Sequence, residues 1–223
     1  VQEQGLAMMN DLAGIAVATL GALMLMGYLL GSIPFGLLVA RLTGGPDPRS
    51  VGSGRTGGTN ALRALGRRRA AVVSAGDILK GALPVLAVRA LGGGDGTEVA
   101  AALFAVVGAT RSIWVGFKGG RGIATGFGTA LAIAPIALAA AAPIFIVVIW
   151  RTRIVSLGSL AAVAAFAPIE IFVRMQTPDG LSIWALAYSI VGPALVWLAH
   201  ADNIARLRAG TERTFDAGAL TRD

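Results

Sequence analysis

Long uncharged hydrophobic runs alternate with short polar, glycine-rich stretches along almost the whole chain. The first run, Leu12 to Ala40, has no charged residue and exceeds the roughly 20 residues of a spanning helix. Gly31 and Pro34 lie in it, so we predict a kink there. The further runs are 70–91, 99–107 (to 114 if the helix continues), 123–134, 135–150, 154–173 and 181–199. The pattern predicts an all-α, polytopic bundle of about seven transmembrane helices.

Basic residues gather in alternate connections between these runs. If the connection after the first run is cytoplasmic, 16 of the 19 basic residues lie on that side, and only Lys80, Arg89 and Arg174 do not. The positive-inside rule then predicts an outside N-terminus and a cytoplasmic C-terminus. We expect a short extracytoplasmic segment at 1–11, one membrane domain at 12–213 and a cytoplasmic tail at 214–223. Residues 1–11 contain no Lys or Arg, which is unlike a cleavable signal peptide.

The composition also indicates a membrane protein. The chain is 55% hydrophobic and 14% charged, with mean hydropathy +0.73, whereas a soluble domain carries about 25% charged residues. The net charge of +7 does not indicate nucleic-acid binding, because no soluble domain remains that could form a binding surface for nucleic acid. With no cysteine and only His200, thiolate catalysis, protein-bound thioesters and multi-histidine metal sites are excluded. We expect neither a cofactor nor a metal.

The stretch 49–63 is the longest polar segment between hydrophobic runs, and it contains no carboxylate. Its glycines let backbone N–H groups converge on an anion, and its arginines suit phosphate. A helix starting near Asn60, its expected N-cap, would point its positive end at the same place. The candidate phosphate ligands are Ser53, Gly54, Thr59, Asn60 and Arg63, with Arg49 in support. The alternative is a flexible loop whose arginines face lipid headgroups.

A second glycine-rich basic loop runs from Gly116 to Gly122, with Lys118, Gly119, Gly120 and Arg121 as candidate phosphate ligands. The alternative is a hairpin turn with snorkelling basic ends. On the predicted topology this loop, the stretch 49–63 and the tail at 200–213 all emerge on the cytoplasmic face. Two such loops on one face, both leading into helices, favour a composite phosphate site.

Two further groups of polar residues have both structural and functional interpretations. His200 and Asn203 share a face if the last helix continues to a cap at Gly210; His200 is then a candidate general base or a solvated histidine at a helix end. Asp77 and Lys80 are three residues apart inside a hydrophobic run, which favours an ion pair over a catalytic role.

Together these residues resemble the bacterial acyl-phosphate:glycerol-3-phosphate acyltransferases, from about Tyr28 to Glu212. The first block holds the segments 31–36, 47–49 and 52–63, followed by Asp77 and Lys80-Gly81. The second block is Phe117-Lys-Gly-Gly-Arg-Gly-Ile-Ala-Thr-Gly126, and the third joins His200, Asn203, Arg206-Leu207 and 210–212. The chain departs from the family pattern at several positions. Arg55, Thr56 and Gly58 replace Asn, Ile and Ala, Ala109 and Ser112 replace His and Pro, and Arg121 replaces Lys.

The resemblance implies transfer of a fatty acyl group from acyl phosphate to the 1-hydroxyl of sn-glycerol 3-phosphate, giving 1-acylglycerol 3-phosphate and phosphate. It implies Ser53, Arg63 and Lys118 as glycerol phosphate ligands, and His200 and Asn203 as groups near the reacting acyl phosphate. Asp77, Lys80 and Glu212 are supporting residues. The base is His200 or a phosphate oxygen of the substrate. We expect a monomer in the bacterial plasma membrane with a cytoplasmic active site.

Two other classes of function remain open. A transporter of an organic phosphate would place charges along a path through the membrane and often shows an internal repeat. Here only Asp77 and Lys80 lie deep, and no repeat is visible. A non-catalytic scaffold could bind anionic lipid through its basic residues, but it would not need three separate polar blocks. The acyltransferase interpretation is therefore favoured.

Overall fold

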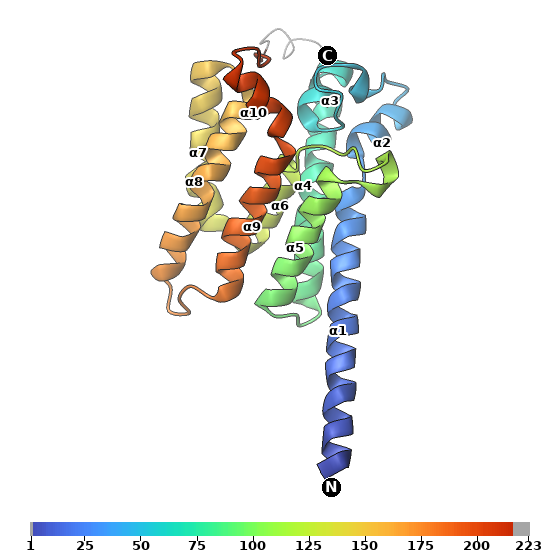
Figure 1. Cartoon of the computed structure of the whole chain (residues 1–223). Coiled ribbons are helices and arrows are strands. Elements are labelled where there is room, and N and C mark those ends of the chain that lie inside the picture. The colour runs from blue at the N-terminus through green and yellow to red at the C-terminus, as the bar shows by residue number, and fades with distance from the viewer. Residues whose placement is uncertain (1, 216–223) are drawn as a thin grey trace.

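The computed structural model describes residues 2–215, and within them the chain is helical and contains no strand (Figure 1). The elements, in chain order, are α1 (Gln2–Ser32), α2 (Phe35–Leu42), η1 (Pro48–Ser50), α3 (Gly58–Leu65), α4 (Arg67–Ala90), α5 (Asp95–Thr110), η2 (Ile113–Val115), α6 (Ile123–Ile133), α7 (Pro135–Thr152), α8 (Val155–Met175), α9 (Ile183–Ala199) and α10 (Ala201–Arg208).

Five helices of the described chain are long and apolar enough to cross a membrane: α1 from Ala13, α4, α5 with η2, α7 and α8. A sixth span is possible if α9 and α10, bent by 64° against each other, count as one. The all-helical membrane class predicted from the sequence is therefore confirmed. The fourth predicted span corresponds to α6, whose 11 residues are too few to cross a bilayer alone. The number of seven spans and their orientation stay predictions.

The break in the first hydrophobic run lies where the sequence predicts it. Helix α1 ends at Ser32 and α2 begins at Phe35, because Pro34 has no N–H to continue the ladder. The ammonium of Lys80 donates to the freed carbonyl of Ile33 at 2.8 Å and pairs with the Asp77 carboxylate at 2.6 Å. The predicted Asp77–Lys80 ion pair is thus confirmed, and Lys80 also binds a carbonyl group at the break between α1 and α2. The apolar span of α1 runs from Ala13 to Ser32, close to the start of the predicted run, and the helix itself begins earlier, at Gln2.

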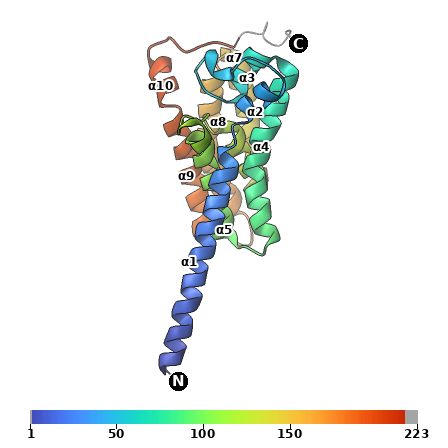
Figure 2. The same ribbon diagram turned by 90° about the vertical axis from the view of Figure 1, so that its right-hand side faces the viewer.

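Close backbone contacts between helices hold the bundle together. Helices α1 and α5 run side by side (Figures 1 and 2), and a Cβ at Gly31 would collide with the backbone of Ala105. A Cβ at Gly128 of α6 would collide with Ile78 of α4 in the same way. Glycines allow such approaches in membranes, where packing replaces the hydrophobic effect as the main attraction between helices.

Helix α6 ends inside the bundle, and two arginines satisfy its last carbonyl groups. Arg174 donates to the carbonyl of Ile133 at 2.9 Å and to the buried carboxylate of Glu170 at 2.7 Å. Arg89 binds the preceding carbonyl at 2.9 Å and pairs with Glu98 at 2.6 Å. Cations suit helix C-termini, and a polar backbone group in a membrane needs a partner. These pairs allow a short helix to stop there.

The Arg174–Glu170 pair gives a test of this arrangement. Arg174→Gln leaves the Glu170 carboxylate, whose side chain is 1% exposed, without its cation, at a cost of about 3 kcal/mol or more. We expect the midpoint of thermal unfolding in detergent to fall by about 6–12 °C. The double variant Arg174→Gln with Glu170→Gln removes the unpaired charge and should recover part of the loss. If Arg174→Gln melts like wild type, the pair does not support α6.

Candidate active site

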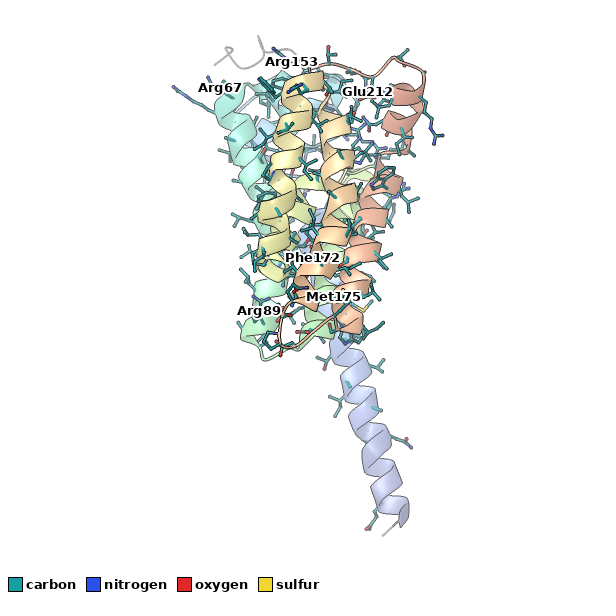
Figure 3. All side chains as sticks on the ribbon, turned by 90° about the vertical axis from the view of Figure 1, so that its left-hand side faces the viewer. Arg67, Arg89, Arg153, Phe172, Met175 and Glu212 are labelled. Atoms are coloured by element: carbon teal, nitrogen blue, oxygen red, sulfur yellow. The ribbon has the colours of Figure 1, made fainter. Side chains whose placement is uncertain are left out.

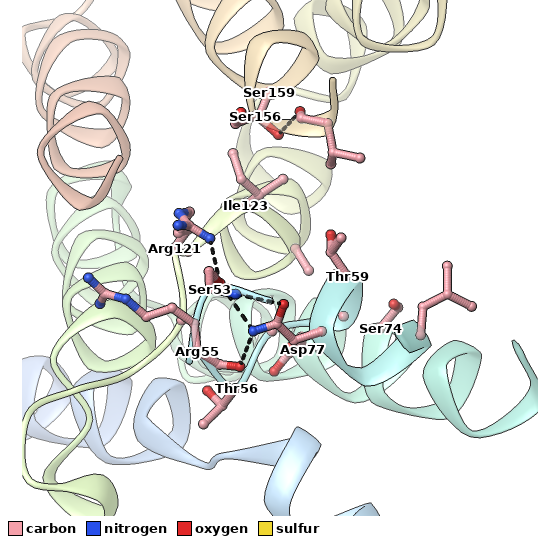
Figure 4. Close-up of a pocket in the computed structure, with 18 of the residues that line it drawn as sticks. Ser53, Arg55, Thr56, Thr59, Ser74, Asp77, Arg121, Ile123, Ser156 and Ser159 are labelled. Atoms are coloured by element: carbon pink, nitrogen blue, oxygen red, sulfur yellow. Dashed lines mark hydrogen bonds between the residues drawn. The ribbon is translucent and has the colours of Figure 1, made fainter. Parts of the chain in front are cut away.

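A cavity of about 590 Å³ opens among α3, α4, the start of α6, the α7–α8 turn and α10 (Figure 4). It lies toward the end of the bundle where Figure 3 places Arg67, Arg153 and Glu212, opposite Arg89 and Met175. The stretch 49–63, the loop 116–122 and the tail after His200 all contribute lining residues. The structure therefore brings the three polar blocks of the sequence together in one site.

Asn60 organises the first glycine-rich loop. Its side-chain amide donates to the Ser53 hydroxyl oxygen at 3.1 Å and to the Arg55 carbonyl at 2.9 Å, and its oxygen accepts from Arg63 at 3.2 Å. The expectation that Asn60 caps the helix is wrong, because Gly57 occupies the N-cap and Asn60 lies buried within the first turn of α3. Asn60 instead folds the loop onto the helix.

The Ser53 side chain lines the cavity, and the hydrogen bonds that its oxygen accepts determine where its hydroxyl hydrogen can donate. Its oxygen accepts from Asn60 and, at 3.1 Å, from Arg121 (Figure 4). With two donors on the oxygen, the hydroxyl hydrogen remains for a substrate acceptor. The first N–H groups of α3, beside Thr59, lack partners within the helix, and Gly58 and Thr59 also line the cavity. This end of the cavity is thus built from donors, which suits a phosphate.

Arg121 connects the second loop with the last helix. One guanidinium nitrogen donates to Ser53, and another lies 3.0 Å from the carboxylate of Asp202 in α10. Burial lowers the pKa of Arg121 from its ordinary value. Burial tends to raise the pKa of Asp202, but the charges of Arg121 and Arg206 outweigh it and leave that pKa below its usual range. Asp202 is therefore ionised at neutral pH, and it holds the Arg121 side chain against Ser53.

His200 lies at the break between α9 and α10, is 1% exposed and lines the cavity. Its Nδ1 lies 2.8 Å from the carbonyl oxygen of Val196, so this nitrogen carries the proton and Nε2 is left as an acceptor. Burial lowers the pKa of the imidazole, and the charge of Arg121 acts in the same direction. His200 is therefore neutral at pH 7.

Asn203 is buried one turn beyond His200. Its amide donates to one oxygen of Glu212 at 2.7 Å, while Arg206 donates to the other at 2.8 Å. The Asn203 carbonyl oxygen is buried without a hydrogen-bond partner in the structure, although buried acceptors are normally paired. An oxygen of this kind, in the wall of a cavity, can accept from a substrate hydroxyl.

Several predicted ligands lie outside the cavity. Lys118 is exposed and does not line it, nor does Gly54. Arg49 is about half-exposed and pairs with Asp47 at 2.7 Å. Gly119 does not line the cavity either, whereas Gly120 does. The N–H groups of both glycines donate to carbonyls at the end of α5, so neither N–H is available to a phosphate here. The phosphate-binding roles of these residues stay predictions.

The two departures near the second loop have visible consequences. Ala109, where the family resemblance leads one to expect histidine, lines the cavity, so the missing imidazole leaves His200 as the only one in this site. Ser112, at the expected proline, is buried and donates its hydroxyl to the carbonyl of Ser32 at the end of α1. The hydroxyl thus satisfies a carbonyl that the end of α1 leaves open.

A second, apolar cavity of about 210 Å³ lies among α6, α7, α8 and α9. It shares Ile123, Phe145 and Ser159 with the polar cavity, so the two spaces adjoin. Thr129 and Tyr188, hydrogen-bonded to each other at 2.8 Å, lie in its wall. Elsewhere the lining is almost wholly hydrocarbon, which suits an alkyl chain.

The fold and the donor-rich cavity beside an apolar one define a membrane protein that handles a phosphate ester with an alkyl chain. Residues 21–210 match the model of the glycerol-3-phosphate acyltransferase family. The glycerol-3-phosphate acyltransferase of Geobacter sulfurreducens is 40% identical over 94% of this chain and 100% of its own length. That of Thermus thermophilus is 44% identical over 85% of this chain and 92% of its own length.

Solved structures agree with the sequence comparisons. The crystal structure of PlsY (YgiH), an integral membrane glycerol 3-phosphate acyltransferase in its glycerol 3-phosphate form, has a TM-score of 0.80 and 34% identity, covering 92% of this chain and 100% of that one. Its lysophosphatidic acid form gives 0.78 and 33%, covering 91% and 98%. The chain belongs to the glycerol-3-phosphate acyltransferase family, and the resemblance seen in the motif blocks is confirmed.

Other residues of the site escaped the sequence analysis: Ser74, Ser156, Asp202, Arg213 and Phe215. Asp202 follows His200 by two residues and precedes Arg206 by one helical turn, which signals only a local ion pair. Its partner Arg121 is 81 residues away, and no local pattern reveals that contact. Arg213 and Phe215 lie beyond the family motifs.

Arg63 and Lys118 provide a matched comparison. The resemblance implies both as ligands, but only Arg63 lines the cavity. We expect Arg63→Gln to raise KM for glycerol phosphate by about tenfold or more, since it removes a charge-assisted contact worth roughly 1.5–3 kcal/mol. Lys118→Gln should change KM by less than about threefold. The measurement is initial-rate kinetics at equal membrane expression, and a larger effect at Lys118 would contradict the placement of that loop.

Proposed function

We propose that this cavity transfers a fatty acyl group from acyl phosphate to the 1-hydroxyl of sn-glycerol 3-phosphate, releasing 1-acylglycerol 3-phosphate and phosphate. As a member of its family, the protein is an acyltransferase that acylates glycerol 3-phosphate to lysophosphatidate. The identity of the donor, the roles of individual residues and the sidedness of the site are the proposed parts.

The observation that best supports this proposal is the excess of positive charge in the cavity. Six basic side chains line it against two carboxylates, Asp77 and Glu212. The six are Arg55, Arg63, Lys80, Arg67, Arg121 and Arg213. Lys80 and Arg121 are paired with carboxylates, and in residues 2–215 the other four make no ion pair. A surplus of this size matches two phosphorylated substrates, which repel each other and must be held side by side.

The apolar cavity supports a fatty acyl donor. It adjoins the polar cavity through Ile123, Phe145 and Ser159, so a molecule with a phosphate in one space can place its alkyl chain in the other. An acyl phosphate is a mixed anhydride that already carries a good leaving group. It therefore requires no covalent intermediate on the protein, in agreement with a chain that has no cysteine.

The chemistry needs a base for the 1-hydroxyl and donors for the departing phosphate. Neutral His200, with Nε2 as an acceptor, can take the hydrogen bond of the hydroxyl, and the free oxygen of Asn203 can orient the neighbouring hydroxyl. Ser53, Arg121 and the N-terminus of α3 supply donors to phosphate oxygens. The proton goes either to His200 or to a phosphate oxygen of the substrate.

The direct test uses purified protein in detergent or lipid, supplied with glycerol 3-phosphate and one acyl donor at a time. With acyl phosphate we expect lysophosphatidate and inorganic phosphate in equal amounts. With the matching acyl-CoA we expect no product above background. Product with acyl-CoA alone would overturn the proposed donor, and glycerol phosphate crossing sealed vesicles without acylation would support a transporter instead.

His200→Gln separates the two possible bases. A histidine base with a lowered pKa must be deprotonated to act, so kcat would rise with pH through a value below about 6.5. His200→Gln would then lose this pH dependence, and its kcat would fall by a factor of about 10²–10⁴. If the substrate phosphate takes the proton, much activity and a rise near pH 6 remain, because that pKa belongs to the phosphate. We expect the second result, measured as kcat against pH.

We further propose that the protein lies in the bacterial plasma membrane as a multi-pass monomer, with its N-terminus outside and this cavity open to the cytoplasm. The distribution of basic residues supports this orientation. The predicted tail at 214–223 follows α10 on the cavity side, and its residues 216–223 lie outside the described residues.

Cysteine labelling tests the orientation against a background without native cysteines. Gly94 and Lys118 lie in different connections of the chain, on opposite sides of α5 in the sequence. We expect an impermeant thiol reagent added to intact cells to label Gly94→Cys and to spare Lys118→Cys. Both should react after the cells are opened. The reverse pattern would overturn the topology and the cytoplasmic active site.

A further inference from the structure

The segment from Thr211 to Phe215 forms part of the cavity wall although it lies beyond residues 21–210, the part of the chain that matches the family model. Glu212, Arg213 and Phe215 all line the cavity. Glu212 is accounted for by its hydrogen bonds to Asn203 and Arg206. No role has yet been assigned to Arg213, which adds a cation to the same wall.

The segment is fixed on both sides of Arg213. Before it, the Glu212 carboxylate is held by Asn203 and Arg206, and the Glu212 side chain is only 6% exposed. After it, the backbone N–H of Phe215 donates to the carbonyl of Arg153 in the α7–α8 turn. Arg213 therefore belongs to a short tether between α10 and that turn, and it keeps its place at the cavity.

Arg213 and Arg63 form a pair of like charges in this wall. Burial lowers the pKa of the Arg63 guanidinium, and the positive charge of Arg213 lowers it further, while Glu212 acts in the opposite direction. Within residues 2–215 neither arginine makes an ion pair with a carboxylate. Both arginines line the cavity, Arg213 as an exposed residue, and the Glu212 carboxylate nearby is already bound by Asn203 and Arg206.

We propose that Arg213 binds substrate phosphate together with Arg63, as a cationic ligand supplied by the C-terminal segment. The inference rests on the proposed function and deepens it. The ligand is a phosphate monoester dianion, which glycerol 3-phosphate provides, or the acyl phosphate group of the donor. A phosphate between the two guanidinium groups replaces their repulsion by two charge-assisted interactions.

The test compares Arg213→Gln and Arg213→Lys with the control Arg208→Gln. Arg208 is exposed on α10, makes no ion pair in the described chain and does not line the cavity. Initial rates are measured with each substrate varied in turn, and binding of glycerol 3-phosphate alone is measured by titration calorimetry. Thermal unfolding of each variant shows whether the tether remains folded.

We expect Arg213→Gln to raise KM for at least one substrate by about 5–20-fold, with kcat changed less than KM. The substrate whose KM rises is the one that Arg213 contacts. Arg213→Lys keeps the charge and should recover most of the affinity, and Arg208→Gln should leave both KM values within about twofold of wild type. All variants should unfold at the same temperature.

Other outcomes overturn the inference or the proposed function separately. If wild type is active and Arg213→Gln keeps both KM values, Arg213 does not bind substrate. Equal effects of Arg213→Gln and Arg208→Gln would indicate only the general positive field and would also overturn it. If wild type turns nothing over but binds glycerol 3-phosphate, and Arg213→Gln weakens that binding, the proposed reaction fails while the role of Arg213 stands. No binding by wild type would refute both.

Discussion

A membrane-embedded chain can interrupt a helix only where something satisfies the freed backbone groups. The described part of this chain has three such interruptions, and two of them lie at the site. Lys80 donates to the Ile33 carbonyl at the first break, and Arg89 and Arg174 donate to the last carbonyls of α6. At His200 the backbone hydrogen bonds continue into the first turn of α10. The breaks at Ile33 and His200 adjoin the cavity, because Lys80 and His200 both line it. The end of α6 lies near Arg89, at the opposite end of the bundle (Figure 3), where it supports the packing of the helices and not the cavity itself.

Arg121 is the residue through which the three polar blocks act as one site. It is positioned by the start of α6, donates to Ser53 of the first loop and pairs with Asp202 of α10. Arg55 adds a second link, donating to the carbonyl of Gly119. A lysine at position 121 would supply charge, but the planar guanidinium offers two separate directions at fixed geometry. The same side chain therefore supplies positive charge to the site and links the first loop to α10.

The sequence was sufficient for features that depend on neighbours along the chain. The uncharged hydrophobic runs and Pro34 predicted the all-helical membrane class and the first break, and the three-residue spacing predicted the Asp77–Lys80 pair. It failed where the fold of a loop or a residue far along the chain determines the partner of a polar group. Asn60 looked like a helix cap, but it folds the loop onto Ser53, and the amides of Gly119 and Gly120 end α5. No pattern of neighbouring residues in the sequence indicates a contact such as that between Arg121 and Asp202.

The arrangement of charges also bears on the proposal that one cavity holds two phosphorylated substrates. Lys80 and Arg121 are neutralised by carboxylates at the deep and middle levels of the wall, so their role is to fix helices and orient donors. Arg63 and Arg213 are cations without such partners in the described chain, at the side closed by the C-terminal segment. A dianion gains most where cations are not already paired with carboxylates. On the proposed function, the tether between α10 and the α7–α8 turn therefore places a cation where phosphate binds, and the apolar cavity that adjoins the site at Ile123 takes the alkyl chain of the donor.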